Sequence, residues 1–229
     1  MSGVEMTIKK LNPDNERERV KKLYQYEDEI YKQGYELIAG VDEAGRGSLA
    51  GPLTVGAVIL PKDFYLERLD DSKKLSPAVR EKLYDEIVYN AIAVSSIAVS
   101  VEEIDKFNVY QATLRGMDKA IATLNIQPDY VLIDAMKIYL QNIPVRSIVH
   151  GDSLSASIAA ASIVAKVTRD RMAEEWSKLY PEYGFDKNKG YGTREHMDAI
   201  KKNGFTPIHR KTYEPYRSTL KKNIQIELF

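Results

Sequence analysis

Short apolar runs alternate with longer amphipathic segments along most of this chain. Valine, isoleucine, leucine and alanine dominate the short runs, and turns rich in glycine, proline or aspartate separate them. This pattern predicts strands at residues 36–43, 53–60, 91–100, 130–134 and 146–150. It predicts helices at residues 76–89, 100–124, 156–179 and 193–204.

The order of these elements predicts an α/β fold. The first two strands are joined by a short turn, so we expect them to pair antiparallel. Three early strands, followed by strands that alternate with helices, are typical of a mixed five-stranded sheet flanked by helices. The predicted helix at 156–179 is rich in small residues, which would let it lie close to that sheet.

A further segment, at residues 12–34, is rich in charge and carries one apolar stripe. Asn12 and Pro13 supply a cap and a first-turn proline, and Gly34 ends the pattern. We predict one surface helix here, within an N-terminal extension of residues 1–35. Residues 36–229 then form a single domain, which ends in a C-terminal helical segment.

Composition excludes several classes of protein. The hydrophobic fraction of 44% over 229 residues supports a sizeable core. No apolar run approaches the roughly 18 residues that span a bilayer, and no secretory signal is evident, so we expect a cytoplasmic protein that does not engage membranes. Cysteine is absent, so any metal must be held by oxygen or by one of three histidines. The formal net charge of zero argues against a protein that coats nucleic acid non-specifically.

Carboxylates follow three of the predicted strands. Asp42 and Glu43 end the first strand, Asp134 ends the fourth, and Asp152 follows the fifth across one glycine. Acids in apolar surroundings need a partner. Because ligands bind at the carboxyl ends of strands in open α/β sheets, we expect these four acids to meet there.

Four clustered carboxylates repel one another strongly, and divalent cations relieve that repulsion. Since thiol ligands are absent, oxygen-preferring Mg²⁺ or Mn²⁺ is the expected metal. A pair of such ions held by carboxylates is the usual device for phosphodiester hydrolysis.

Each acid also has a structural alternative. Asp134 could be a turn or cap residue, Asp152 could cap the following helix, and Asp42 with Glu43 could pair with Arg46 or a lysine. Asp70 and Asp71 are better interpreted as solvated loop acids. Asp170, flanked by arginines far along a helix, is better interpreted as a surface ion pair.

Several polar residues near the acids are candidates for binding a phosphate-rich ligand. The turn Gly45-Arg46-Gly47 follows the acids directly, and its N–H groups could face a ribose or phosphate. Ser72 and Lys73 could grip a phosphate or be a solvated charge run, and Tyr191, between two glycines, could stack on a sugar or base or be an exposed loop residue. Lys166 could be a buried partner for an acid or extend to solvent. The histidines at 150, 196 and 209 are scattered, which leaves a catalytic triad unsupported.

Together these motifs resemble those of type 2 ribonuclease H. The resemblance covers roughly residues 36–217. It rests on Gly40–Gly47, Asp71–Leu75, Val131–Asp134, Gly151–Ser153, Ala159–Arg171, Lys189–Tyr191 and Pro207–Arg210.

The resemblance implies an RNase H-like fold and cleavage of the RNA strand of RNA–DNA hybrids. It also implies incision on the 5′ side of single ribonucleotides in duplex DNA, which leaves 5′-phosphate and 3′-hydroxyl ends. Asp42, Glu43, Asp134 and Asp152 match the family's metal-binding acids. Gly45, Arg46 and Gly47 match the loop that reads the ribose 2′-hydroxyl, and Tyr191 matches a tyrosine that stacks beside the junction sugar.

Three positions depart from the family pattern without removing a catalytic group: Ser48, Ala135 and His150. The helix expected at 12–34 lies outside the shared core, and we expect it to pack on the domain or to help hold substrate. The alternative function is a non-catalytic nucleic-acid binding module on the same fold, and four repelling carboxylates argue against it. A phosphate-sugar NTPase that uses the glycine-rich turn is disfavoured because no G-x-x-x-x-G-K-[ST] motif is present. We expect a monomer.

Overall fold

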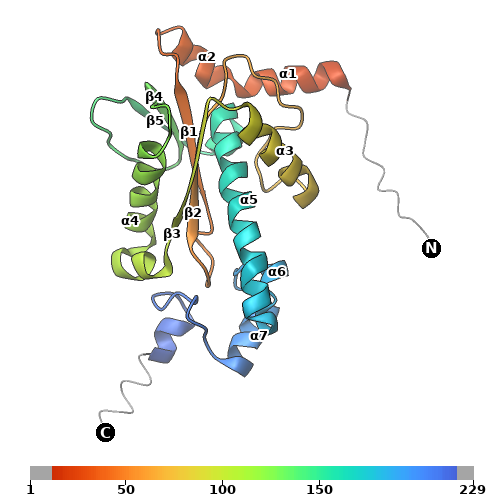
Figure 1. Ribbon diagram of the computed structural model, residues 1–229, viewed down its shortest axis with the longest axis vertical. Coiled ribbons are helices and arrows are strands. Elements are labelled where there is room, and N and C mark those ends of the chain that lie inside the picture. Colours follow the sequence, from red (N-terminus) through yellow and green to blue (C-terminus); the bar gives the residue numbers. More distant parts are fainter. Residues whose placement is uncertain (1–11, 221–229) are drawn as a thin grey trace, which may run out of the picture.

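The computed structural model describes residues 12–220 and places a five-stranded sheet at their centre (Figure 1). The strand order is β3-β2-β1-β4-β5. β1 pairs antiparallel with β2 and parallel with β4, and β4 pairs parallel with β5, so the predicted mixed sheet is confirmed. The strands are β1 Ile38–Ala44, β2 Leu53–Ile59, β3 Ala93–Val99, β4 Tyr130–Asp134 and β5 Val145–Ile148.

Helices cover both faces of the sheet. α4 lies on one face, whereas α5 crosses the other face with α3 packed beside it (Figure 1). The side chains of Ser76, Ser100 and Thr193 cap helices, since each accepts a hydrogen bond from the first turn of the helix that follows it. The long helices are α3 Pro77–Asn90, α4 Val101–Ala122, α5 Ala156–Leu179 and α7 Arg194–Asn203, and the short ones are η1 Gly151–Ser153, η2 Pro181–Tyr183 and α6 Phe185–Asn188. Residues 216–220 are also helical.

Two glycines of the central strands let α5 approach the sheet. A Cβ atom on Gly40 would lie 2.0 Å from the backbone carbon of Ser157, and one on Gly56 would lie 2.3 Å from the carbonyl oxygen of Ala161. The facing positions on α5 are small and fully buried, as expected for this helix. This contact fixes the N-terminal half of α5 against β1, the strand that carries Asp42.

The N-terminal segment forms two helices, so the prediction of one continuous helix was wrong. α1 Pro13–Leu23 and α2 Gln25–Tyr31 meet at Tyr24, whose ring is buried and whose hydroxyl donates to the carbonyl oxygen of Phe64. The break turns the chain so that both helices contact the domain. Val20 and Leu23 join the core formed with α3 and α5, and Ile30 packs with residues of β1 and α5.

A second core lies beyond the far end of the sheet, around the C-terminal half of α5. Trp176 packs there with Phe185 and with residues of α7. Although the histidines are scattered along the sequence, His196 and His209 are buried side by side, with their Nε2 atoms 3.1 Å apart. Burial lowers the pKa of both, so the pair stabilises this core in its neutral form. Within residues 12–220, no helix has the length and apolar character needed to cross a membrane.

We expect Gly40→Ala to lower the free energy of unfolding by about 3 kcal/mol, since the added methyl group meets helix backbone that cannot rotate away. Urea unfolding followed by circular dichroism measures the change. Gly47→Ala is the matched control, because a Cβ atom added there would have no heavy atom within 4 Å and stability should stay within about 0.5 kcal/mol. Equal unfolding midpoints for both variants would contradict the close approach of α5.

Candidate active site

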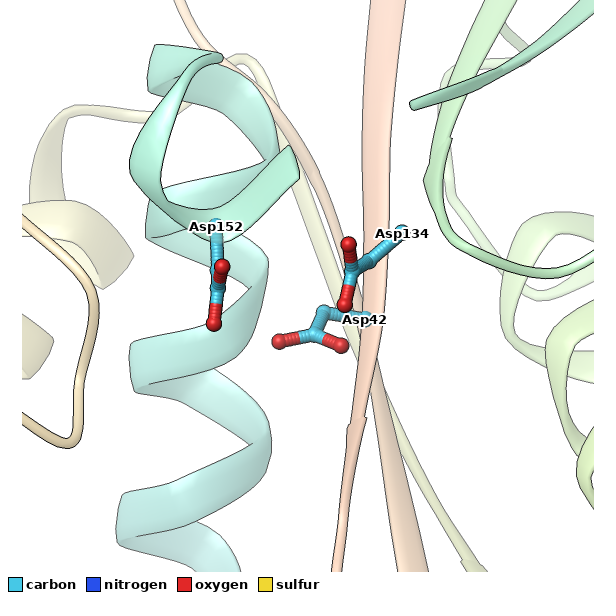
Figure 2. Close-up of side chains that lie close together, drawn as sticks. All are labelled: Asp42, Asp134 and Asp152. Carbon is cyan, nitrogen blue, oxygen red and sulfur yellow. The ribbon is translucent and has the colours of Figure 1, made fainter. Parts of the chain in front are cut away.

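Three aspartates from three chain segments meet at one edge of the sheet. β1 carries Asp42, β4 ends on Asp134, and η1, after β5, carries Asp152. Because β1, β4 and β5 run parallel, their carboxyl ends share that edge. One oxygen from each carboxylate lies within 4.8 Å of the others, and the three side chains point toward a common centre (Figure 2). The expected convergence of these three residues is therefore present in the structure.

The aspartate cluster carries more negative charge than its surroundings neutralise. Asp42 and Asp152 are buried, whereas Asp134 is partly exposed. Burial and the nearby charges of Glu43 and Asp134 raise the pKa of Asp42 well above its ordinary value. Burial also raises the pKa of Asp134, although the N–H of Gly151 donates to its Oδ1 atom at 2.7 Å and opposes that shift. Such a site gains stability from a bound cation.

Glu43 lies beside the cluster without joining its innermost group of oxygen atoms. Its Oε1 atom is 3.3 Å from Nη1 of Arg46, whereas its Oε2 atom is buried with no hydrogen-bond partner. Burial raises the pKa of Glu43 and the charge of Arg46 opposes this. A buried carboxylate oxygen without a partner is costly, and a cation would satisfy it. This oxygen and the three aspartates form an all-oxygen donor set that fits Mg²⁺ or Mn²⁺.

Lys73 supplies a positive charge at the outer side of the cluster. Its Nζ atom lies 2.9 Å from Oδ2 of Asp152, while most of its side chain is exposed. Burial of the ammonium lowers its pKa, but the hydrogen bond and the charges of Asp152, Asp71 and Asp42 outweigh that effect and raise it. Lys73 therefore stays charged and reaches both the acids and solvent.

Ser72 faces the protein interior instead of the solvent. Its hydroxyl lies 2.9 Å from that of Ser162 on α5, and its carbonyl oxygen accepts from Arg80. Both contacts hold the loop that presents Lys73. A phosphate contact from the Ser72 side chain stays a prediction.

Asp170 is the centre of a buried ion-pair network, so its interpretation as a surface ion pair was wrong. It bonds Lys166 one helical turn earlier and lies 3.6 Å from Nη2 of Arg80. Lys166, whose side chain is partly buried, is thus the partner of an acid. Because Arg80 also donates to the carbonyl oxygens of Ser72 and Leu75, the network supports the loop that carries Lys73.

Two buried arginines hold the glycine-rich turn after β1. Arg210 donates to the carbonyl oxygens of Gly45, Arg46 and Gly51 at 2.8 to 3.0 Å. Arg169, on α5, donates to three more carbonyl oxygens, those of Ala50, Pro52 and Lys189, at 2.7 to 3.1 Å. Both side chains are fully buried, and burial lowers the pKa of Arg169 to about 10, so it remains charged at neutral pH.

Sequence reasoning gave no role to these two arginines. The sequence contains one indication that Arg169 is buried. It lies four residues from Ala165 and four from Ala173, on the buried side of α5. An arginine on such a face must find many acceptors. Nothing comparable in the local sequence indicates the contacts of Arg210, since they join residues more than 150 positions apart.

The segment that carries Tyr191 lies beside the glycine-rich turn. The carbonyl oxygen of Gly190 accepts from the N–H of Leu49, and the Tyr191 ring lies 5.5 Å from the guanidinium carbon of Arg169. The ring is 38% exposed, so one part of it is open to a ligand. Arg169 therefore links Tyr191 to the turn at Gly45, where a Cβ atom would lie 2.0 Å from the arginine Nε atom.

We expect Arg210→Lys to lower the free energy of unfolding by about 3 kcal/mol, because one ammonium cannot replace three diverging donors to buried carbonyl oxygens. Urea unfolding measures the loss. Arg171→Lys, at an exposed arginine of α5 that pairs with Glu81, is the matched control and should stay within about 1 kcal/mol of the parent. Similar losses in both variants would show that Arg210 does not anchor the turn.

Comparison of the sequence with known proteins gives a family match over most of the chain. The family model for ribonuclease HII matches residues 39–215. Ribonuclease HII of Bacillus cytotoxicus is 52% identical over 209 residues, covering 91% of this chain and 80% of the relative, and that of Enterococcus faecalis is 49% identical over 224 residues, covering 96% and 88%.

Solved structures extend the comparison to the fold. Ribonuclease H2 of Pyrococcus horikoshii superposes with a TM-score of 0.69 at 30% identity and covers 81% of this chain and 97% of its own. RNase HII of Archaeoglobus fulgidus, solved in complex with PCNA, gives a TM-score of 0.68 at 26% identity over 78% and 95%. With its acids at the shared edge of three parallel strands and a family match over most of its length, the chain belongs to the ribonuclease HII family.

Proposed function

We propose that Asp42, Glu43, Asp134 and Asp152 hold two divalent cations, Mg²⁺ or Mn²⁺, in this ribonuclease H endonuclease. The observation that carries the proposal is the convergence of three carboxylate oxygens within 4.8 Å beside the unpartnered Oε2 atom of Glu43. Bound there, the cations supply activation of the attacking water and stabilisation of the leaving oxygen.

The protein orients each acid for this role. Asp134 uses its Oδ1 atom to accept from the N–H of Gly151, and Asp42 uses its Oδ1 atom to accept from the N–H of Glu43. We propose that the remaining oxygen atoms of both residues face the cations. Lys73 is exposed next to Asp152 and offers an ammonium group to a phosphate oxygen of the substrate.

The turn at Gly45, Arg46 and Gly47 is proposed to read the ribose 2′-hydroxyl. Its carbonyl oxygens at Gly45 and Arg46 point to Arg210. In a planar trans peptide the N–H points opposite to the carbonyl, so the N–H groups of Arg46 and Gly47 are directed away from that arginine. These N–H groups are suited to a hydroxyl or phosphate oxygen close to the acids.

The proposed substrates are RNA–DNA hybrids and DNA duplexes that contain single ribonucleotides, with incision on the 5′ side of the ribonucleotide. We propose further that the protein acts as a monomer, and duplex substrates of this kind support action in the cytoplasm. A non-catalytic binding module on the same fold would gain nothing from three buried or half-buried acids at one point.

The test is cleavage of a labelled DNA duplex that contains one ribonucleotide, with Mg²⁺ or Mn²⁺. We expect incision 5′ of the ribonucleotide by the wild type and a loss of at least about a hundredfold in rate for Asp134→Asn. Asp134→Asn should fold, because it removes a repelling charge and keeps an oxygen that can accept from Gly151. All-DNA duplex of the same sequence is the control substrate. Equal cutting of both duplexes, or near-wild-type activity of folded Asp134→Asn, would refute the proposal.

Tyr191→Ala should reduce incision at a single ribonucleotide by roughly tenfold and affect long hybrids less, because stacking on one junction sugar or base is lost. Tyr191→Phe keeps the ring and should retain most of the activity. Tyr139→Ala removes a tyrosine that is 91% exposed elsewhere and serves as the matched control. Kinetics on the two substrates measure the effect, and equal losses on both would exclude a role for Tyr191 at the junction.

A further inference from the structure

α2 places one carboxylate in the protein interior, at the N-terminal end of α5. Glu27 is 0% exposed. Its Oε1 atom accepts from the hydroxyl of Ser155 at 2.6 Å and from the N–H of Ser157 at 2.9 Å. Ser155 is the N-cap residue of α5, and the positive end of a helix dipole favours a nearby carboxylate. Glu27 thus joins the N-terminal extension directly to the start of α5.

The same helix start is bonded to the turn that carries Asp152. The N–H of Ser155 donates to the carbonyl oxygen of Gly151 at 2.9 Å. On its other side, Gly151 donates its N–H to Oδ1 of Asp134 at 2.7 Å. A Cβ atom on Gly151 would lie 2.6 Å from Ile158, so α5 also packs closely on this turn. A continuous series of hydrogen bonds therefore runs from Glu27 through Ser155 and Gly151 to Asp134.

Repulsion among the acids makes such an anchor valuable. Without a cation, the charges of Asp42, Asp134 and Asp152 favour moving the turn that holds Asp152 away from the strands. If the turn had moved, it would have to return to its position when a cation binds. The free energy needed for that return would weaken the binding of the cation.

We infer that Glu27 is a positioning residue, which fixes Asp152 at the distance from Asp42 and Asp134 that a divalent cation requires. The inference rests on the metal site of the proposed function. Glu27 lies in the N-terminal extension, before the stretch that the family model matches. It therefore supports the metal site from outside that stretch. Its contact with the site passes through Ser155 and involves no substrate.

The experiment is direct titration of the purified full-length protein with Mn²⁺ by isothermal titration calorimetry. We expect Glu27→Ala to weaken the Kd for Mn²⁺ by about tenfold, the lower end of the effect of removing supporting contacts around a metal site. Glu27→Gln keeps an acceptor oxygen for Ser155 and Ser157 and should restore most of the affinity.

Glu16→Ala is the matched control for loss of a buried glutamate. Glu16 is buried in α1 of the same extension, where it bonds Arg19 and the N–H of Arg68, and none of these bonds involves α5 or the turn at Asp152. Its replacement should lower stability and leave the Kd for Mn²⁺ unchanged.

The outcomes separate this inference from the proposed function. If the wild type binds no Mn²⁺, the proposed metal site fails. If the wild type binds Mn²⁺ and Glu27→Ala binds it equally tightly, only the positioning role is overturned. Should Glu27→Ala not fold, Ser155→Ala breaks the same connection, and an unchanged Kd in that variant would overturn the inference equally.

Discussion

The mutual repulsion of acids at one edge of the sheet is the constraint on which the rest of this structure depends. A fold can hold Asp42, Asp134 and Asp152 together only if the backbone positions that carry them cannot separate. Two of these positions lie in hydrogen-bonded parallel strands, and the third lies in a turn fixed by Gly151 and by the start of α5. The free energy of folding thereby keeps together a charged site that is suited to bind cations.

α5 holds both ends of the site in place. Its first turns lie against β1 at Gly40 and support the turn of Asp152, whereas Arg169, in its middle, holds carbonyl oxygens of two loops. A buried guanidinium bonded to neutral carbonyl oxygens is costly unless most of its N–H groups are satisfied, so these loops cannot move independently of the helix. The acids and the glycine-rich turn are therefore parts of one rigid unit built on α5.

Local signals in the sequence predicted the features that depend on local physics. Strand-length apolar runs predicted the observed strands, and acids at the ends of strands predicted the observed position of the aspartates. The errors concern long-range packing. The break at Tyr24 arises because its side chain is buried against Phe64, and Asp170 is buried because Arg80, ninety residues earlier, lies opposite it.

The site residues also divide into those that the sequence predicts and those that depend on long-range packing. Three aspartates could be placed together because sheet topology follows from the order of strands, and strand direction puts carboxyl ends on one edge. The contacts of Arg210, which reach back to Gly45, Arg46 and Gly51, depend on how a distant loop closes over the turn. The pairing of Lys73 with Asp152 could not be deduced either, since a lysine in a polar loop is equally compatible with solvent.

The short distance along the chain between the acids and the turn has a consequence for selectivity. Glu43 ends one side of the cluster and Gly45 begins the turn, so at most about 7 Å of extended backbone separates them. Arg210 binds the carbonyl oxygens of that turn. The N–H groups of the turn are therefore held in a fixed position relative to Asp42. A sugar bound by these N–H groups is consequently placed at a constant distance from the acids. If the turn reads the ribose as proposed, recognition of the ribose and alignment of its phosphodiester are one binding event, and a deoxyribose loses alignment as well as one hydrogen bond.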